Sequence, residues 1–300
     1  TAMASKRRGK HIITTKIEHA SVYEPMFFLE NEGFEVTYLD VDEKGIIDLK
    51  QLKDCIREDT ILVSCMLVNN EIGAVEPIEV IGKMIKSRNP AVVFHVDAIQ
   101  GYGKIPVVPK NEGIDLLSMS GHKIHGPKGV GFLYVKEKTK IQPLILGGGQ
   151  QKGMRSGTEN VPGIAGLSKA CQIMAGHLKE NADKIGEVRD YFRSRVTEIP
   201  EIKDNSGDAP HVASISFKNI RSEVLLHALE DREIYVSSGS ACSSNRPHVS
   251  GTLSAIGLSP EYRDGTLRFS FSVYNTKEEV DQVIAALEEL VPMLRKFVRR

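Results

Sequence analysis

The chain has no tryptophan, and aromatic residues make up only 6% of its 300 residues. It has no excess of charge, because 39 basic residues balance 39 acidic ones. This balance argues against a general affinity for nucleic acid or anionic membranes. No apolar run approaches the ~20 residues of a membrane span, and the first residues show no signal-peptide pattern. We therefore expect a cytoplasmic protein with no direct nucleic-acid or membrane partner.

Cysteine is also scarce. The four cysteines are scattered along the chain and lack the paired spacing of a metal site. They indicate reduced thiols in a reducing compartment and exclude a disulfide framework. The four are Cys55, Cys65, Cys171 and Cys242.

The remaining composition is that of an ordinary globular protein, with 41% hydrophobic and 26% charged residues. In the first half, short β-rich runs alternate with helical patterns. The runs cover residues 11–15, 34–41, 60–68 and 91–98. Such β-α-β alternation predicts an α/β fold with a mostly parallel sheet covered on both faces.

The pattern changes after the glycines at 147–149. A long helical stretch from Asn160 to about Thr197 is followed by strands and helices of a smaller α+β domain. The last helix should begin at a capping box, Thr276 to Glu279. We predict a large α/β domain over 1–160, a connecting helix over 161–200, and a small α+β domain over 201–300.

One motif is unusual for a surface loop. The stretch "SMSGHKIHGPKG" places Lys123 between two histidines and bounds it with glycines. A lysine among glycines is usually a solvated loop residue. A lysine that acts as an amine nucleophile, however, must lose its proton near neutral pH and needs a special setting.

Polar residues follow several of the expected strands. Asn70 follows the run at 60–68, Asp97 and Gln100 follow the run at 91–98, and His19 follows the first run. Ser120, His122 and Lys123 come after "IDLLSMS". Each alone has a structural explanation. Their shared position at strand ends predicts a ligand site at the carboxyl edge of the sheet.

A lysine and an aspartate facing one ligand suggest pyridoxal phosphate. The lysine would form a Schiff base with its aldehyde, and the carboxylate would keep the pyridine nitrogen protonated. Ser120 and His122 offer hydroxyl and imidazole donors for the phosphate.

The second half holds two further candidates. Cys242 lies in the small-residue loop "VSSGSACSSNRPHVSG" and is either incidental or a thiolate nucleophile on a moving loop. Arg268, in "GTLRFSFS", is either paired in the core or holds a substrate carboxylate. The sequence leaves both alternatives open.

Together these motifs resemble a known family. "IEHASV", "VNNEIG", "HVDAIQ", "SGHKIHGPKGVG", "GGGQQKGMRSGTENV" and "SSGSACSS…LRFS" occur in order across nearly the whole chain. They resemble the pyridoxal-phosphate-dependent cysteine desulfurases of the NifS/IscS type, which are class V aminotransferases of fold type I. The combination is specific, although no single motif is, and the Cys242 loop resembles the long-loop group.

The resemblance implies a role for each matching residue. Lys123 would hold the cofactor and move protons, and Asp97 would pair with the pyridine nitrogen. Gln100 would bond the phenolic oxygen, and His19 would stack on the ring and assist proton transfer. The phosphate would be bound by Ser120 and His122, and by Thr158 from the partner subunit of a homodimer. Asn70 and Arg268 would hold the substrate carboxylate, and Cys242 would take the sulfur.

The implied reaction converts L-cysteine to L-alanine and leaves a persulfide on Cys242. The persulfide would pass to an acceptor, either an iron–sulfur cluster scaffold or a tRNA-thiolation enzyme. A mobile loop would let one thiol visit both the cofactor and the acceptor.

The chain departs from the family pattern at its start. The family's "NSATT"-like strand and "SGATE"-like phosphate-binding turn would lie before Thr1. If nothing supplies that segment, we expect weaker cofactor binding, at roughly 1.5–3 kcal/mol for each charge-assisted hydrogen bond lost. Two alternatives therefore stay open: a cofactor-poor scaffold that docks with sulfur acceptors, and another class V lyase or aminotransferase.

Overall fold

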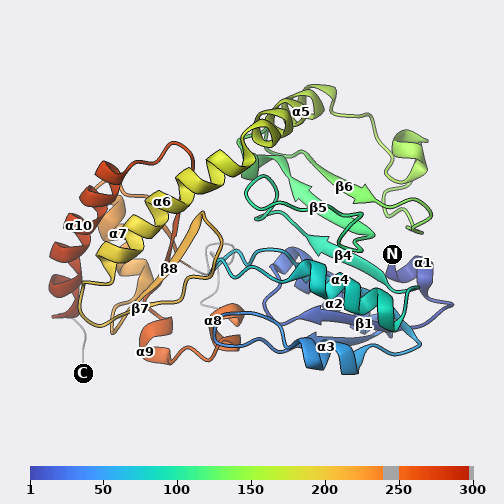
Figure 1. Cartoon of the computed structure of the whole chain (residues 1–300), viewed down its shortest axis with the longest axis horizontal. Helices are drawn as coiled ribbons and strands as arrows, with labels where there is room; N and C mark the ends of the chain where they lie inside the picture. The colour runs from blue at the N-terminus through green and yellow to red at the C-terminus, as the bar shows by residue number, and fades with distance from the viewer. Residues whose placement is uncertain (239–249, 297–300) are drawn as a thin grey trace. The chain divides into compact units, whose positions relative to one another are not determined.

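The chain folds into two compact units, and the computed structural model describes residues 1–238 and 250–296 (Figure 1). Unit 1 comprises Thr1–Asp40, Ile47–Val68 and Glu76–Leu178, and unit 2 comprises Val41–Ile46, Asn69–Val75 and Lys179–Arg300. Two short segments from the first third of the chain thus belong to unit 2. The domain limits expected from the sequence stay a prediction.

Unit 1 contains a six-stranded sheet in the order β2-β1-β3-β4-β5-β6. The first five strands run parallel, and β6 pairs antiparallel with β5. The predicted α/β class with a mostly parallel sheet is therefore confirmed. The strands are β1 His11–Thr15, β2 Glu35–Leu39, β3 Thr60–Met66, β4 Val93–Asp97, β5 Leu116–Ser120 and β6 Gly131–Val135.

Burial explains why the inner strands appear in the sequence as continuous β-rich runs. Every residue of β1 and of β3 is buried, as expected for inner strands covered on both faces. The edge strand β6 has no fully buried residue. The helical elements of unit 1 are α1 Ala2–Ser5, α2 Ala20–Asn31, α3 Leu49–Cys55, α4 Ile78–Arg88, α5 Val161–Gly176, and the 3₁₀ turns η1 Gly121–Ile124 and η2 Gln150–Gly153.

Unit 2 contains an antiparallel sheet in the order β7-β8-β10-β9. Its strands are β7 Ile202–Asp204, β8 Val212–Phe217, β9 Ser237–Ser238 and β10 Thr266–Ser270. Its helices are α6 Leu178–Val196 (apart from Leu178), α7 Ser222–Glu230, α8 Gly251–Ala255, α9 Pro260–Arg263 and α10 Lys277–Arg295. The unit is thus α+β, as the sequence predicts for this part of the chain.

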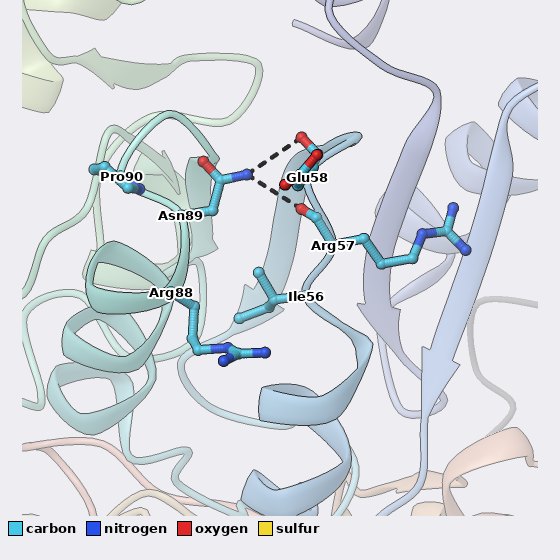
Figure 2. A pocket seen from close by; sticks show the side chains of 6 residues that line it. All are labelled: Ile56, Arg57, Glu58, Arg88, Asn89 and Pro90. Carbon is cyan, nitrogen blue, oxygen red and sulfur yellow. Dashed lines mark hydrogen bonds between the residues drawn. The ribbon is translucent and has the colours of Figure 1, made fainter.

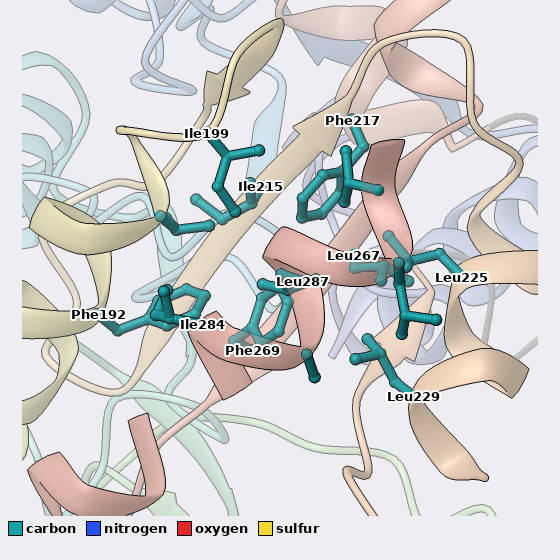
Figure 3. Close-up of a cluster of buried hydrophobic side chains, with 14 of the residues drawn as sticks. Phe192, Ile199, Ile215, Phe217, Leu225, Leu229, Leu267, Phe269, Ile284 and Leu287 are labelled. Atoms are coloured by element: carbon teal, nitrogen blue, oxygen red, sulfur yellow. The ribbon is translucent and has the colours of Figure 1, made fainter. Parts of the chain in front are cut away.

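The core of unit 2 is formed by apolar side chains from α6, α7, α10 and the sheet (Figure 3). Phe192 of α6 packs against Phe269 of β10 with ring centroids 4.5 Å apart. Leu267 and Leu287 are completely buried. The expected capping box is present: Thr276 accepts from the Glu279 N–H, and the Glu279 side chain accepts from the Thr276 N–H.

The helical stretch expected from Asn160 to Thr197 is divided into α5 and α6. The break lies at His177, whose φ of −134° is not helical and whose N–H bonds the Met174 carbonyl. Gly176, directly before it, disfavours helix continuation because glycine has the most backbone freedom to lose. None of the helices within 1–238 and 250–296 combines the length and apolarity that a membrane crossing needs.

Candidate active site

The carboxyl edge of the parallel sheet brings several of the predicted residues together. Met66 of β3 is the register partner of Asp97 of β4, and Asp97 is the partner of Ser118 of β5. The chain then leaves β5 at Ser120 and enters the turn that carries Lys123. Asp97 and the Lys123 turn therefore follow neighbouring strands at one edge, as expected for a ligand site in this type of sheet.

The Lys123 turn is closed by tight backbone geometry. Its last helical residue is followed by His125 in the left-handed region, with φ 61°, and Gly126 N donates to the Gly121 carbonyl at 2.9 Å. A Cβ at Gly121 would lie 3.1 Å from both the Pro127 carbonyl oxygen and a methyl of Leu167. The glycine is thus needed for close packing, which explains part of the motif around the lysine.

The two phosphate-binding candidates lie next to each other. Ser120 Oγ and His122 Nδ1 are 2.8 Å apart. Partial desolvation of the ring, and then the charges of Lys123 and Lys128, lower the pKa of His122. His122 itself is exposed, and Thr158 lies in the exposed stretch between η2 and α5.

Asp97 is buried, with 5% of its surface exposed. Its Oδ1 accepts from the Ile99 N–H at 2.9 Å. Burial raises the pKa of Asp97, and the Ile99 N–H and the nearby His19 oppose that rise. No lysine or arginine of the described residues forms an ion pair with it. Gln100 follows in the next turn and is half-buried.

His19 is placed by the start of α2, where it is the N-cap residue. Its Nδ1 accepts from the Ser21 N–H at 3.1 Å and lies 2.8 Å from Ser21 Oγ. Because Nδ1 accepts, the neutral ring carries its proton on Nε2. His19 follows the end of β1 and Asp97 ends β4, so both lie at the carboxyl edge of the sheet.

The two substrate-binding candidates meet within unit 2. Arg268 Nη1 donates to the backbone carbonyl of Asn70 at 2.7 Å, and Nη2 donates to Ser237 Oγ at 3.2 Å. Glu71 accepts from Ser250 Oγ at 2.5 Å. Burial raises the pKa of Glu71, against the opposing effects of Ser250, Thr252 and Arg268. Arg268 is therefore fixed by a carbonyl and a hydroxyl beside Asn70.

The sequence reasoning missed Glu18. Its Oε1 accepts from Thr15 Oγ1 at 3.1 Å and from Met66 N at 2.9 Å, so it joins the ends of β1 and β3. Burial, and then the charge of Asp97, raise the pKa of Glu18 to about 8. The only sequence signal was its place next to His19 in "IEHASV".

The reasoning also missed Lys104, whose Nζ donates to the backbone carbonyl of Lys123 at 2.8 Å. A lysine four residues after Gln100, directly after Gly101 and Gly103, could have drawn attention. His95, in contrast, has a structural setting: its ring nitrogens lie 2.8 Å from Ser64 Oγ and from Ser118 Oγ. Burial lowers the pKa of His95 to about 4, so it is neutral within the sheet.

The opposite edge of this sheet, at the amino ends of its parallel strands, has a surface hollow (Figure 2). It is lined by residues 56–58 and 88–90. Asn89 Nδ2 spans it to the carbonyls of Arg57 and Glu58, at 3.1 and 3.4 Å. The Arg57 guanidinium pairs with Glu35 and with Asp59, at 2.7 and 2.9 Å. None of the predicted site residues lines this hollow. Cys242 lies outside the described residues.

Comparison with known proteins identifies the family of the chain. The model of the family described as "Aminotransferase class-V" matches residues 1–283. "Cysteine desulfurase IscS" of Clostridium botulinum is 44% identical over 302 residues, covering 99% of this chain and 76% of that protein.

Solved structures agree. A "NifS-like protein" has a TM-score of 0.91 and 39% identity, covering 98% of this chain and 78% of that one. A structure titled "SspA in complex with cysteine" has a TM-score of 0.77 and 35% identity, covering 92% of this chain and 78% of that one. The fold is therefore the predicted fold type I, and the chain belongs to the class V aminotransferase family, with relatives of the IscS/NifS cysteine desulfurase type.

Proposed function

We propose that this chain is a cysteine desulfurase that removes sulfur from L-cysteine and leaves L-alanine. Its similarity to proteins named cysteine desulfurase, and to a structure that contains cysteine, supports this activity. The observation that carries the proposal is the pairing of two features at one sheet edge. Asp97 is a buried carboxylate with no ion pair among the described residues, and the neighbouring strand leads into the turn of Lys123.

The donor set at this edge fits pyridoxal phosphate. It offers a primary amine, a buried carboxylate for a pyridinium N–H, and a hydroxyl–imidazole pair for phosphate oxygens. Since a buried carboxylate is stabilised by a cation, the pyridinium would supply what Asp97 lacks. We propose that the cofactor is held by Lys123, Asp97, Gln100, His19, Ser120 and His122.

When bound, pyridoxal phosphate accepts the electron pair that Cα of the substrate retains on losing its proton. The chain supplies the other parts. Asp97 would accept a hydrogen bond from the ring nitrogen and keep its proton in place. Lys123 Nζ would hold the cofactor and would carry a proton. The Ser21 N–H donates to Nδ1 of His19, so the proton of the neutral ring is on Nε2.

The remaining roles follow from the family resemblance. Asn70 and Arg268 would hold the substrate carboxylate, and the fixed guanidinium of Arg268 reduces the ordering cost of that contact. The Cys242 thiolate would attack the substrate sulfur. As the new S–S bond forms, the C–S bond would break. Its electron pair would stay with the substrate carbon, which takes up a proton to give alanine, and the sulfur would remain on Cys242 as a persulfide.

We also propose a cytoplasmic homodimer in which Thr158 reaches the phosphate of the partner's site. Leu144 and Leu146 are 89% and 80% exposed, and Val161 is 66% exposed. Apolar surface on both sides of Thr158 in the sequence supports an interface there. The persulfide would then pass to an iron–sulfur scaffold or a tRNA-thiolation enzyme.

The test is product formation from L-cysteine with added pyridoxal phosphate and a thiol that releases persulfide as sulfide. The parent should yield alanine and sulfide in equal amounts. Lys123→Ala should abolish both, and Cys242→Ser should keep the cofactor but lose about 100-fold or more of the sulfide rate. Cys171→Ser serves as the matched control. Sulfide release by Cys242→Ser at the parental rate would indicate another lyase, and no turnover by the parent would reject the proposal.

A further inference from the structure

A second lysine is fixed against the backbone of Lys123. Lys104 lies in the segment that follows β4, and its Nζ donates to the Lys123 carbonyl at 2.8 Å. Carbonyls at the end of a helical turn have no partner within the turn. Lys104 satisfies this one, so it ties the segment after β4 to the turn after β5.

The hydrogen bond from Lys104 to this carbonyl costs free energy, because it buries an ammonium group. Burying an ammonium group is unfavourable unless a charge of opposite sign compensates it. Among the residues that the structure describes, no carboxylate forms an ion pair with Lys104. Burial, and then the positive charge of Lys123, lower the pKa of Lys104 to about 8. A water molecule or an uncharged donor could satisfy the carbonyl at less cost, so the positive charge itself needs an explanation.

The surroundings of the turn enhance the effect of that charge. On the same turn, partial desolvation and the charges of Lys123 and Lys128 lower the pKa of His122. Helix α5 faces the turn and its neighbours with apolar groups: Leu167 lies beside Gly121, Ala170 beside Gly126, and Met174 beside Gly103. An apolar wall strengthens the repulsion between two ammonium groups, because it lowers the local dielectric constant.

We propose that Lys104 is a positioning residue that fixes the Lys123 turn and, through its charge, disfavours the ammonium form of Lys123. A lysine beside another cation is a nucleophile near neutral pH for this reason. The inference rests on the proposed function, in which the Lys123 amine must attack a carbonyl carbon. It adds a device that makes this amine available.

The test measures the Lys123 amine directly and without added cofactor. Trace acetic anhydride is applied to the folded chain between pH 6 and 11, and acetylation of the Lys123 peptide is quantified by mass spectrometry. Lys104→Met removes donor and charge, Lys104→Gln keeps a donor without charge, and Lys104→Arg keeps the charge. Lys110→Met, at an exposed lysine, is the matched control.

At pH 7, where Lys104 is charged, Lys123 should be labelled about tenfold more slowly in the Met and Gln variants than in the parent. A tenfold change corresponds to one pH unit in the midpoint of the amine. The Arg variant and the Lys110 control should stay within about twofold of the parent. Equal rates in the parent, Gln and Arg variants would overturn the inference.

A melting curve identifies any variant that does not fold. If Lys104→Met does not fold, the comparison of Lys104→Gln with Lys104→Arg still tests the inference. The readout also separates the two proposals. If the parent does not take up pyridoxal phosphate but the Gln variant slows labelling, the proposed function fails and the effect of Lys104 on Lys123 stands. If the parent binds cofactor and labelling is unchanged, only the inference fails.

Discussion

The charged residues at the two ends of the parallel strands, the amino edge and the carboxyl edge of the six-stranded sheet, differ in pairing and in burial. At the amino edge, Arg57 pairs with Glu35 and Asp59 at 2.7 and 2.9 Å, and all three residues are exposed to solvent. At the carboxyl edge, Asp97 and Lys104 lie largely out of solvent, and neither has an ion-pair partner within the described chain.

The buried charges at the carboxyl edge lower the stability of the fold, whereas the exposed ion pairs at the amino edge do not. Exposed ion pairs contribute little, because water already solvates both partners. Buried charges without partners cost free energy, and strongly perturbed groups of this kind gather at functional sites. We therefore propose that the carboxyl edge is the active edge and that the hollow at the amino edge is an ordinary surface feature. Three substitutions test this comparison.

The largest effect is expected from Asp97→Asn. The amide can still accept from Ile99 N–H but cannot stabilise a protonated ring nitrogen. Sulfide release should fall by about 100-fold or more. Stability at pH 7 should be unchanged or higher, because the pKa of Asp97 is raised and its ionised form is disfavoured by folding. Initial rates and urea unfolding check both parts, and parental activity in this variant would refute the role of Asp97.

A pH-dependent effect is expected from Glu18→Gln. Below pH 4.5 the carboxyl is protonated in both folded and unfolded chains. Between 4.5 and about 8 the unfolded chain loses this proton while the folded chain keeps it, so stability falls as the pH rises. The fall is about 1.4 kcal/mol for each pKa unit of difference.

The Gln variant should lack this contribution, since its amide does not titrate. Urea unfolding of parent and variant at pH 5, 6.5 and 8 measures the difference, which should widen in favour of the variant as the pH rises. Glu24→Gln, at an exposed glutamate, is the control. Parallel pH profiles for parent and Glu18→Gln would show that Glu18 titrates normally.

The smallest effect is expected from Arg57→Ala at the amino edge. It removes two exposed ion pairs, so the melting temperature should fall by about 3 °C or less. Activity per folded molecule should not change. Loss of turnover in this variant would mean that the hollow belongs to the functional site, and the contrast between the two edges would then be wrong.

The mostly parallel sheet could be predicted from the sequence, and so could the placing of the candidate residues at its carboxyl edge. Buried strands such as Thr60–Met66 appear as continuous β-rich runs, and parallel topology fixes which ends meet. Asp97 and Lys123 could therefore be assigned to one edge. Asn70 and Arg268 were named as a pair through the resemblance alone, and the structure joins them by a hydrogen bond.

What could not be predicted depends on burial and on distant contacts. Glu18 and Lys104 look like ordinary charged residues in the sequence, and only folding places them against Met66 and Lys123. The helix break at His177 depends on its non-helical φ angle, which the helical pattern of the sequence does not reveal. The inclusion of Asn69–Val75 in unit 2 likewise follows from tertiary contacts.

The most direct test of the account is the visible spectrum of the chain with pyridoxal phosphate, before and after L-cysteine, with Lys123→Ala alongside. We expect the parent to show an absorbance band that changes when L-cysteine is added. The variant should lack that band or fail to respond. A parent that stays colourless with added cofactor, or a variant that matches it, would contradict the assignment of Lys123 and of the carboxyl edge as the active site.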